Sequence, residues 1–224
     1  MRALVLSLGI AFVVIFVLLF LLVNYNTIYK WDESAFLLIN STFNVSYLNG
    51  FFAALSIYGR EYFWVPVVIL LWLLGKENGK KTALMMVIVF VLVIIIGFAL
   101  KDVYYRPRPF LSIVNAIVLV PKDFDSSFPS GHALVVAAGA TVAFLMLKKR
   151  YSIPLLIEAA LVIYSRVYVG VHYPTDVVAG LFLGAAIALI TYALLVDSRV
   201  FRTISEALIS IYSKVISTVR LKRI

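Results

Sequence analysis

Long apolar runs alternate with short polar or basic segments along most of the chain. An α-helix of about 20 apolar residues crosses the roughly 30 Å hydrocarbon core of a bilayer, and several of these runs approach or reach that length. We expect transmembrane helices at residues 3–23, 61–75, 82–100, 132–147, 153–169 and 175–196. The pattern therefore predicts an all-α fold, an integral membrane bundle of six transmembrane helices.

The first two helices carry specific expectations. The run at 3–23 is too long for the apolar part of a signal peptide, and no small-x-small cleavage site follows it before Asn24. We therefore expect an uncleaved first helix. A Gly-Arg-Glu sequence at 59–61 interrupts the apolar stretch that leads to helix 2, so we interpret 51–58 as an interfacial segment before that helix.

The last segment, 198–224, has a different pattern. Apolar residues recur at three- and four-residue spacing, at Val200, Ile204, Leu208, Ile211, Val215 and Val219. Charged and polar residues occupy the other face, at Arg199, Arg202, Glu206, Ser213 and Arg220. This pattern is typical of a basic amphipathic helix on an anionic membrane surface, and a helix that binds a protein partner is the weaker alternative. We therefore divide the chain into a six-helix membrane domain, 1–197, and an amphipathic tail, 198–224.

Composition supports a membrane protein and excludes other classes. Hydrophobic residues make up 63% of the chain and charged residues only 14%, far from the balance of soluble domains. The absence of cysteine excludes disulfides and thiolate metal sites. The net charge of +9 does not indicate nucleic-acid binding, because the basic residues fall between the apolar runs.

The basic residues also predict the orientation of the chain in the cell membrane. With six crossings, both termini and the turns at 75–81 and 148–152 share one face. The opposite face keeps only Lys30, Arg60, Lys101, Arg106, Arg108, Lys122 and Arg166 of the 20 Lys and Arg residues. By the positive-inside rule, we expect both termini and the tail in the cytoplasm, and the opposite face outside it.

Three short polar motifs stand at the ends of predicted helices, on the extracytoplasmic side. They are Lys101-x6-Arg108-Pro109 (101–109), Pro129-Ser130-Gly131-His132 (129–132) and Ser165-Arg166-x5-His172-x3-Asp176 (165–176). Because successive transmembrane helices reverse direction, the three motifs arrive at the same membrane face. We expect them to form one site.

The residue types of this site suit a phosphate. Lys101, Arg108 and Arg166 supply cations, and each arginine can pair with two phosphoryl oxygens. The motif 129–132 would open a helix, whose free N–H groups and positive dipole end favour an anion. Its glycine lets the backbone approach the ligand closely.

The two histidines of the chain point to covalent catalysis. One can attack phosphorus and form a phosphohistidine, while the other protonates the leaving oxygen and then deprotonates the attacking water. Asp176 follows His172 by four residues, within reach across the start of a helix, and can fix the tautomer of its ring. This spacing favours His172 as the nucleophile and His132 as the acid/base, although chemistry alone leaves the two roles exchangeable.

A metal site is the alternative use of the same residues, since His132, His172 and Asp176 are all of metal-ligating types. However, the three neighbouring cations would repel a divalent ion, and carboxylates are scarce in the chain. We therefore expect neither a metal nor a cofactor.

In this order and between helices, the three motifs closely resemble those of the type 2 phosphatidic acid phosphatase family, over about residues 85–195. The resemblance implies a metal-independent lipid phosphatase that works through a phosphohistidine. It implies that His172 is the nucleophile, His132 the acid/base and Asp176 the partner of His172. It also implies that the substrate phosphate contacts Lys101, Arg108, Ser130, Gly131 and Arg166.

A site at the membrane boundary favours a lipid phosphate or diphosphate over a soluble one. The stretch 113–120 either lines or covers the lateral access of that lipid, or is a plain loop with core contacts. The compact form and the segment 105–110 resemble prokaryotic polyprenyl-diphosphate and phosphatidylglycerophosphate phosphatases. We expect a polyprenyl-diphosphate phosphatase (undecaprenyl or dolichyl type) in carrier-lipid recycling, with a phosphatidic acid or phosphatidylglycerophosphate phosphatase as the alternative.

Two further classes of protein are alternatives to a lipid phosphatase. A lipid phosphotransferase would form the same phosphohistidine but pass the phosphate to another acceptor. A transporter would place its ionisable residues near the bilayer midplane, whereas here they gather at helix ends. The expected partners are the lipid substrate and the bilayer, with no nucleic acid and no obligatory protein partner.

Overall fold

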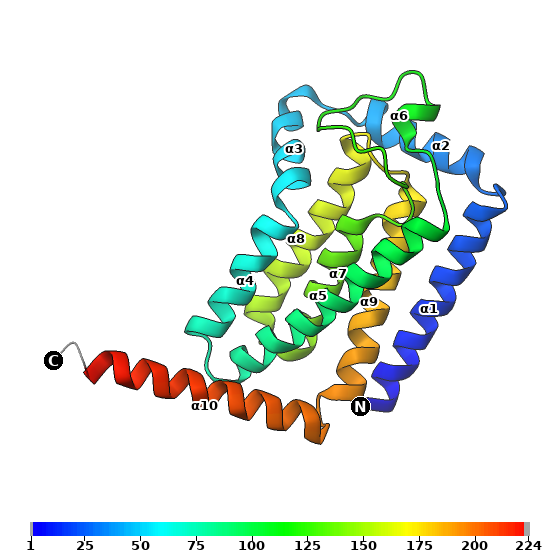
Figure 1. The fold of residues 1–224 in the computed structure, drawn as a ribbon. Helices are drawn as coiled ribbons and strands as arrows, with labels where there is room; N and C mark the ends of the chain where they lie inside the picture. Colours follow the sequence, from blue (N-terminus) through cyan, green and yellow to red (C-terminus); the bar gives the residue numbers. More distant parts are fainter. Residues whose placement is uncertain (1, 222–224) are drawn as a thin grey trace.

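The computed structural model describes residues 2–221, and every regular element in that range is a helix (Figure 1). The helices are α1 (Arg2–Asn24), α2 (Tyr29–Leu37), α3 (Asn49–Tyr58), α4 (Glu61–Leu74), α5 (Glu77–Val103), α6 (Pro109–Ser112), α7 (Gly131–Met146), α8 (Lys149–Tyr168), α9 (Pro174–Leu195) and α10 (Arg199–Leu221). A π-helix (Leu38–Thr42) and a 3-10 helix (Ser46–Leu48) lie between α2 and α3. The all-α prediction is confirmed.

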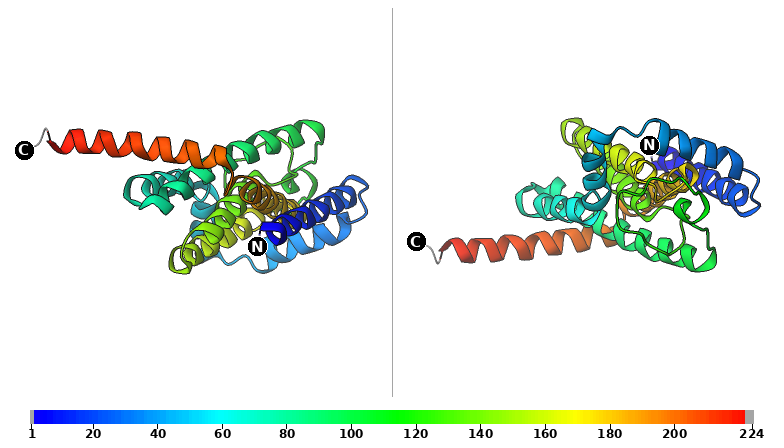
Figure 2. Two further views of the ribbon diagram at one scale, coloured as in Figure 1. Left: turned by 90° about the horizontal axis from the view of Figure 1, so that it is seen from below. Right: turned by 90° about the horizontal axis from the view of Figure 1, so that it is seen from above.

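Helix α9 forms the centre of the bundle and packs against both α1 and α7 (Figure 2). Its glycines let the backbones of α7 and α9 approach closely. A Cβ at Gly184 would lie 2.1 Å from the carbonyl oxygen of Leu134, and one at Gly180 would lie 2.6 Å from that of Ser130. Small residues at helix contacts are usual in membrane bundles. This packing places the start of α7 beside the start of α9, where two of the three motifs lie.

The length and apolar composition of the helices identify the chain as a multi-pass membrane protein. Helices α1, α5, α8 and α9 are each long and apolar enough to cross a bilayer. The segment ending in α3 passes the same test together with α4, with a bend of 58° between them, and α7 is a shorter apolar helix. All six predicted segments are thus helical. By length and composition alone, four helices could each cross a membrane, or five if the bent pair α3–α4 counts as one crossing.

The bend between α3 and α4 falls at Gly59 and Arg60, where the sequence predicted an interruption. Gly59 lies against α8, and a Cβ there would come within 2.2 Å of a valine methyl group. Helix α3 also packs on α8, where the ring centroids of Phe52 and Tyr168 lie 4.3 Å apart. The segment 51–58 is therefore a helix packed on the bundle, and its interfacial position stays a prediction.

One end of the bundle is covered by α2 and by the connection between α5 and α7 (Figure 1). Asn40 holds this layer together, because its amide nitrogen donates to the carbonyl oxygens of Ile117 and Tyr168, both at 2.8 Å. Its amide oxygen accepts from the N–H of Ile117, also at 2.8 Å. Ile113 is buried in the same layer. The stretch 113–120 is therefore a loop with core contacts.

The start of α1 and the end of α9 lie at the opposite end of the bundle, and α10 projects sideways from it (Figures 1 and 2). The hydroxyl of Tyr212 donates to the carbonyl oxygen of Leu73 at 3.0 Å, and the ammonium of Lys80 lies 4.4 Å from the ring of Tyr212. Five residues of the predicted apolar stripe are exposed: Val200, Ile204, Leu208, Ile211 and Val215. The side chains of Val219 and Arg220, and residues 222–224, lie outside the described part. The tail is helical as expected, and its membrane contact stays a prediction.

Candidate active site

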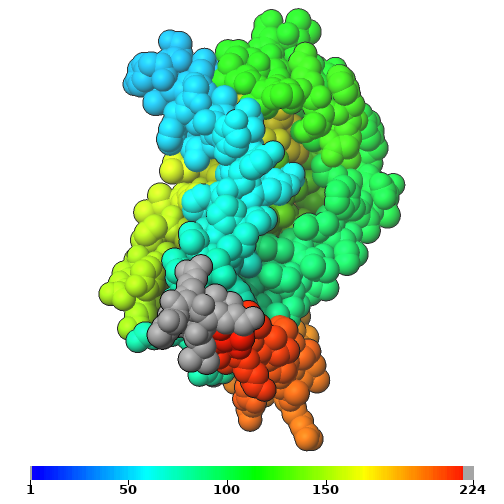
Figure 3. Space-filling view, turned by 60° about the vertical axis from the view of Figure 1, so that its left-hand side comes forward, coloured from blue at the N-terminus to red at the C-terminus, as the bar shows by residue number. Residues whose placement is uncertain are grey.

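A pocket of about 550 Å³ opens near the covered end of the bundle, among α4, α5, α7 and the connection from α8 to α9. In the space-filling view the surface is hollowed between α3–α4 and α5 (Figure 3). The lining includes most of the predicted site residues: Lys101, Arg108, Gly131, His132, Arg166 and His172. The structure therefore brings all three motifs to one cavity.

Lys101, in the last turn of α5, and Arg108, in the connection that follows, share one partner. The Lys101 ammonium donates to Asp125 Oδ2 at 2.6 Å, and Arg108 Nη2 donates to the other oxygen of the same carboxylate. Partial burial acts to raise the pKa of Asp125, but these hydrogen bonds lower it to about 2. Asp125 is therefore an anion held between two cations that the sequence assigned to a phosphate.

Arg166 lies buried at the end of α8 and lines the pocket. Its Nη1 donates to the carbonyl oxygen of Ser56 at 3.0 Å and to the hydroxyl of the same residue. Its Nε is buried and has no hydrogen-bond partner among residues 2–221. Since a buried N–H group without an acceptor costs about 1–3 kcal/mol, Arg166 is suited to bind a ligand oxygen.

The His172 ring is buried and has two distinct edges. Its Nδ1 lies 3.5 Å from Asp176 Oδ2 and 3.4 Å from the hydroxyl of Ser127, which itself donates to Asp176. Its Nε2 lies 3.4 Å from Arg108 Nη1, and both residues line the pocket, whereas Asp176 lies behind it. A proton on Nδ1, held by Asp176, leaves the lone pair of Nε2 on the cationic side of the ring, where it accepts from Arg108 Nη1 at 3.4 Å.

The surroundings of His172 keep it uncharged. Burial comes first, and the positive charges of Arg108, Arg166 and Lys101 act in the same direction. Together they hold the pKa of His172 well below its ordinary value of about 6.5. The imidazole is therefore neutral at physiological pH, which is the form that can attack phosphorus.

The motif 129–132 divides between the pocket and its support. Gly131 and His132, in the first turn of α7, line the pocket, and His132 also lines a smaller adjoining cavity. Ser130 lies behind them and caps α7, because its hydroxyl accepts from the N–H of Ala133 at 3.5 Å. The N–H of Ser130 donates to the carbonyl oxygen of Asp176 at 3.0 Å. The structure thus gives Ser130 a capping role, and its contact with substrate stays a prediction.

A family model described as the PAP2 superfamily matches residues 82–199, which contain all three motifs. The chain belongs to the PAP2 superfamily. It is a phosphatase, as the resemblance of the motifs implied.

Among residues 2–221, no three His, Asp or Glu side chains gather as the ligands of a metal ion would.

Curated relatives of this PAP2 chain extend over most of its length. An undecaprenyl-diphosphatase of Sulfolobus acidocaldarius is 44% identical over 161 residues, which are 72% of this chain and 77% of the relative. The undecaprenyl-diphosphatase BcrC of Bacillus subtilis is 28% identical over 176 residues, 77% of this chain and 89% of the relative. The aligned region is therefore the bulk of both relatives.

Solved structures show the same PAP2 fold. The PAP2-type phosphatidylglycerolphosphate phosphatase of Bacillus subtilis superposes with a TM-score of 0.71 at 24% identity, covering 85% of this chain and 98% of that one. LpxE of Aquifex aeolicus superposes with a TM-score of 0.59 at 33% identity, covering 70% and 91%. At 24% identity the first comparison bears on the fold alone.

Behind the PAP2 site lies a buried ion network that the sequence analysis missed. Arg106 Nη1 donates to Asp176 Oδ1 at 2.5 Å, and Arg106 Nη2 donates to Asp32 Oδ2 at 2.6 Å. Asp32, on α2, also accepts from the N–H of Thr175 at 3.0 Å. Burying these charges is tolerable only because they are paired. Asp32 stands beside Glu33 in a polar connection, so the sequence does not single it out, and only the folded chain reveals its pairing.

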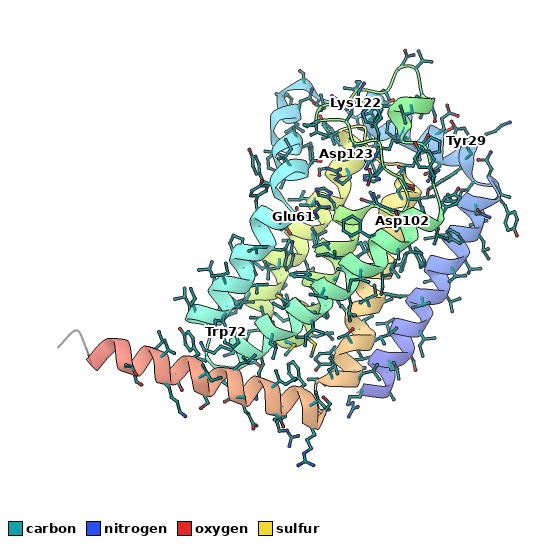
Figure 4. The ribbon with its side chains drawn as sticks, in the orientation of Figure 1. Tyr29, Glu61, Trp72, Asp102, Lys122 and Asp123 are labelled. Carbon is teal, nitrogen blue, oxygen red and sulfur yellow. The ribbon has the colours of Figure 1, made fainter. Side chains whose placement is uncertain are left out.

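Besides Asp125, three charged residues outside the motifs line the pocket: Arg60, Lys122 and Asp123. Asp123 Oδ2 lies 3.9 Å from Arg108 Nη2, at the limit of an ion pair. Lys122 and Asp123 lie on the loop above the site, and Glu61, next to Arg60, marks the start of α4 (Figure 4). Asp123 and Asp125 offset part of the positive charge of the pocket, so its cations are only partly free to bind an anionic ligand.

Proposed function

We propose that this PAP2 enzyme hydrolyses a polyprenyl diphosphate at the extracytoplasmic face and releases phosphate through a phosphohistidine on His172. One observation carries the proposal: a single pocket has a cationic, histidine-containing end and an apolar wall. Such a pocket suits a ligand with a phosphate head and a hydrocarbon chain. The undecaprenyl-diphosphatases of Sulfolobus acidocaldarius and Bacillus subtilis support a polyprenyl diphosphate as that ligand.

The apolar wall comes from α5 and α7, through Val93, Ile94, Gly97, Phe98, Leu134 and Val135. Phe98 is 68% exposed and Ile94 is 48% exposed, on a bundle whose outer surface faces lipid. The hydrocarbon chain would therefore reach the site sideways along α5. The stretch 113–120, considered for this role from the sequence, contributes only Val120, and only to the adjoining cavity.

In the first half-reaction, His172 Nε2 attacks the terminal phosphorus while the bond from phosphorus to the bridging oxygen breaks. Lys101, Arg108 and Arg166 bind the phosphoryl oxygens and stabilise their charge. The first-turn N–H groups of α7, which lack carbonyl partners within the helix, face the same anion. His132 gives its proton to the bridging oxygen, so a polyprenyl monophosphate leaves.

In the second half-reaction, water attacks the phosphorus held on His172, and the P–N bond breaks. His132 accepts a proton from that water, which restores its starting state, and orthophosphate is released. Asp176 holds the Nδ1 proton throughout and stabilises the positive charge that develops on the ring. Arg106 and Asp32 keep Asp176 in place for both steps.

The proposed topology has six crossings, formed by α1, by the bent pair α3–α4, and by α5, α7, α8 and α9. Both termini lie in the cytoplasm, because the basic residues concentrate on their side of the bundle. The site lies at the other end, outside the cytoplasm. The tail, 198–224, lies on the cytoplasmic leaflet through its exposed apolar stripe.

Phosphate release from a panel of lipids tests the function. Purified protein in mixed micelles with excess chelator is given a polyprenyl diphosphate, phosphatidic acid and phosphatidylglycerophosphate. The highest kcat/KM is expected for the polyprenyl diphosphate, and His172→Ala should release no phosphate from it. A preference for either glycerolipid would favour the alternative substrates. Phosphate recovered on an added lipid or sugar hydroxyl, in place of free phosphate, would indicate a phosphotransferase.

A further inference from the structure

A cation outside the three motifs lies on the His132 side of the site. Arg60, at the bend between α3 and α4, lines the main pocket together with His132 and Arg166. The same three residues also line the adjoining cavity, whose volume is about 370 Å³. Lys101 and Arg108 line the main pocket alone. The space beside His132 therefore extends beyond the place where the motif cations would hold one phosphate.

The Arg60 side chain has a donor available for a ligand. Its Nη2 pairs with Glu61 Oε1, which holds one edge of the guanidinium. Its Nη1 lies 3.5 Å from the position that a Cβ on Gly131 would occupy, so it faces the first turn of α7. Its Nε is buried and has no hydrogen-bond partner among residues 2–221. A buried N–H group without an acceptor is costly, and an anion would satisfy it.

We infer that Arg60 binds the second phosphate of the diphosphate, the phosphate that stays on the lipid. This inference rests on the proposed function. When His172 attacks the terminal phosphorus, the bridging oxygen leaves from the opposite side of that phosphorus. His132 protonates the bridging oxygen, so the second phosphate lies next to His132. Arg60 lines both cavities beside His132, so it faces that position.

This assignment makes Arg60 a residue that selects diphosphates. The leaving group of a diphosphate is a phosphate monoester, which is negatively charged and gains charge as the bridging bond breaks. Arg60 stabilises that charge through a charge-assisted hydrogen bond. The leaving group of a lipid monophosphate is an alcohol, which is neutral once His132 has protonated it. Arg60 then has no anion to bind, and only Lys101, Arg108 and Arg166 contribute.

Matched substrates test the assignment. The kcat/KM for phosphate release is measured with farnesyl diphosphate and with farnesyl monophosphate, in the wild type and in Arg60→Gln, Arg60→Lys and Lys30→Gln. Arg60→Gln should lower the value for the diphosphate by about 10- to 100-fold and the value for the monophosphate by less than about threefold. Arg60→Lys should recover part of the loss. Lys30→Gln, which removes an exposed charge outside both cavities, should leave both values unchanged.

An equal loss of kcat/KM on both substrates in Arg60→Gln, or no loss on the diphosphate, would overturn the assignment.

A second measurement does not depend on turnover. Calorimetry gives the dissociation constants of methylenediphosphonate and of orthophosphate for the same purified proteins. Arg60→Gln should raise the dissociation constant of the diphosphonate at least about tenfold and that of orthophosphate by less than about threefold. A wild type that hydrolyses neither lipid would contradict the proposed function, while these two constants would still decide the role of Arg60.

Discussion

Arg106 Nη1 lies 2.5 Å from Asp176 Oδ1, so a residue outside the pocket holds the carboxylate that faces His172, the proposed nucleophile. The other oxygen of Asp176 accepts from the N–H of Tyr173 at 2.8 Å and faces His172 Nδ1 at 3.5 Å. Both oxygens of the carboxylate are therefore fixed. A carboxylate held in this way can present only one edge to the imidazole, and so selects its tautomer.

Replacing Arg106 with Gln should reduce both stability and turnover. Asp32 and Asp176 would remain buried without their cation, and breaking a buried ion pair costs about 3–5 kcal/mol of unfolding free energy. The kcat should fall about 100-fold or more, because the histidine loses its fixed tautomer. Thermal unfolding and kcat of the purified variant measure the two effects.

The double variant Asp32→Asn with Arg106→Gln provides the control for this pair. It removes one of the two stranded carboxylates, so it should be more stable than Arg106→Gln alone. Full stability and full kcat in Arg106→Gln would show that Asp176 does not depend on this contact.

Replacing Asp125 with Asn should strengthen phosphate binding. The Asp125 carboxylate occupies Lys101 and Arg108 in the absence of ligand, so a phosphate must displace it. Because the carboxylate is about half exposed, we expect inhibition by orthophosphate to tighten only about threefold. Asp123→Asn is the matched control and should change the inhibition constant less, since its carboxylate lies 3.9 Å from Arg108. Weaker inhibition in Asp125→Asn would contradict this account of the pocket.

The pH dependence of kcat/KM reports the low pKa of His172. Because its pKa is lowered, His172, the proposed nucleophile, should stay neutral as the pH falls through 6.5, and activity should persist where an ordinary histidine would become protonated. Replacing Arg108 with Gln removes the largest neighbouring charge that lowers this pKa. The pKa should then rise, and the acid limb of the profile should move to higher pH. An acid limb at the same or a lower pH in that variant would contradict the assignment.

Single cysteines test the orientation, because the chain contains no natural cysteine. Lys122, on the loop above the site, and Lys149, at the start of α8, are both exposed and lie at opposite ends of the bundle (Figures 1 and 4). A membrane-impermeant maleimide added to intact cells should label Lys122→Cys, and it should label Lys149→Cys only after permeabilisation. The reverse pattern would invert the proposed topology.

Helix positions and the gathering of the three motifs at one cavity were largely predictable from the sequence. Helix α9 was predicted at 175–196 and is found at Pro174–Leu195, because a proline and a polar motif precede a long apolar run. His172 and Asp176 were expected to meet across the start of that helix, and their side chains lie 3.5 Å apart. In both cases local spacing determines the geometry.

Residues that depend on tertiary contacts were not predictable in the same way. Arg106 and Arg108 stand two positions apart in one motif, yet Arg108 lines the pocket and Arg106 pairs with Asp32 behind it. Arg60 and Asp125 lie outside the motif pattern, and only the folded chain brings them to the site. No periodicity or spacing in the sequence encodes these contacts.

Trapping the covalent intermediate tests the central claim most directly. Wild-type enzyme is mixed with a polyprenyl diphosphate that carries a radioactive terminal phosphate, and is quenched in base within a single turnover. We expect acid-labile, base-stable phosphate on the protein, attached to the peptide that contains His172. The variant His172→Ala, which should still insert into the membrane, should carry no label. Turnover without labelled protein in the wild type, or label that persists in His172→Ala, would contradict a phosphohistidine at this position.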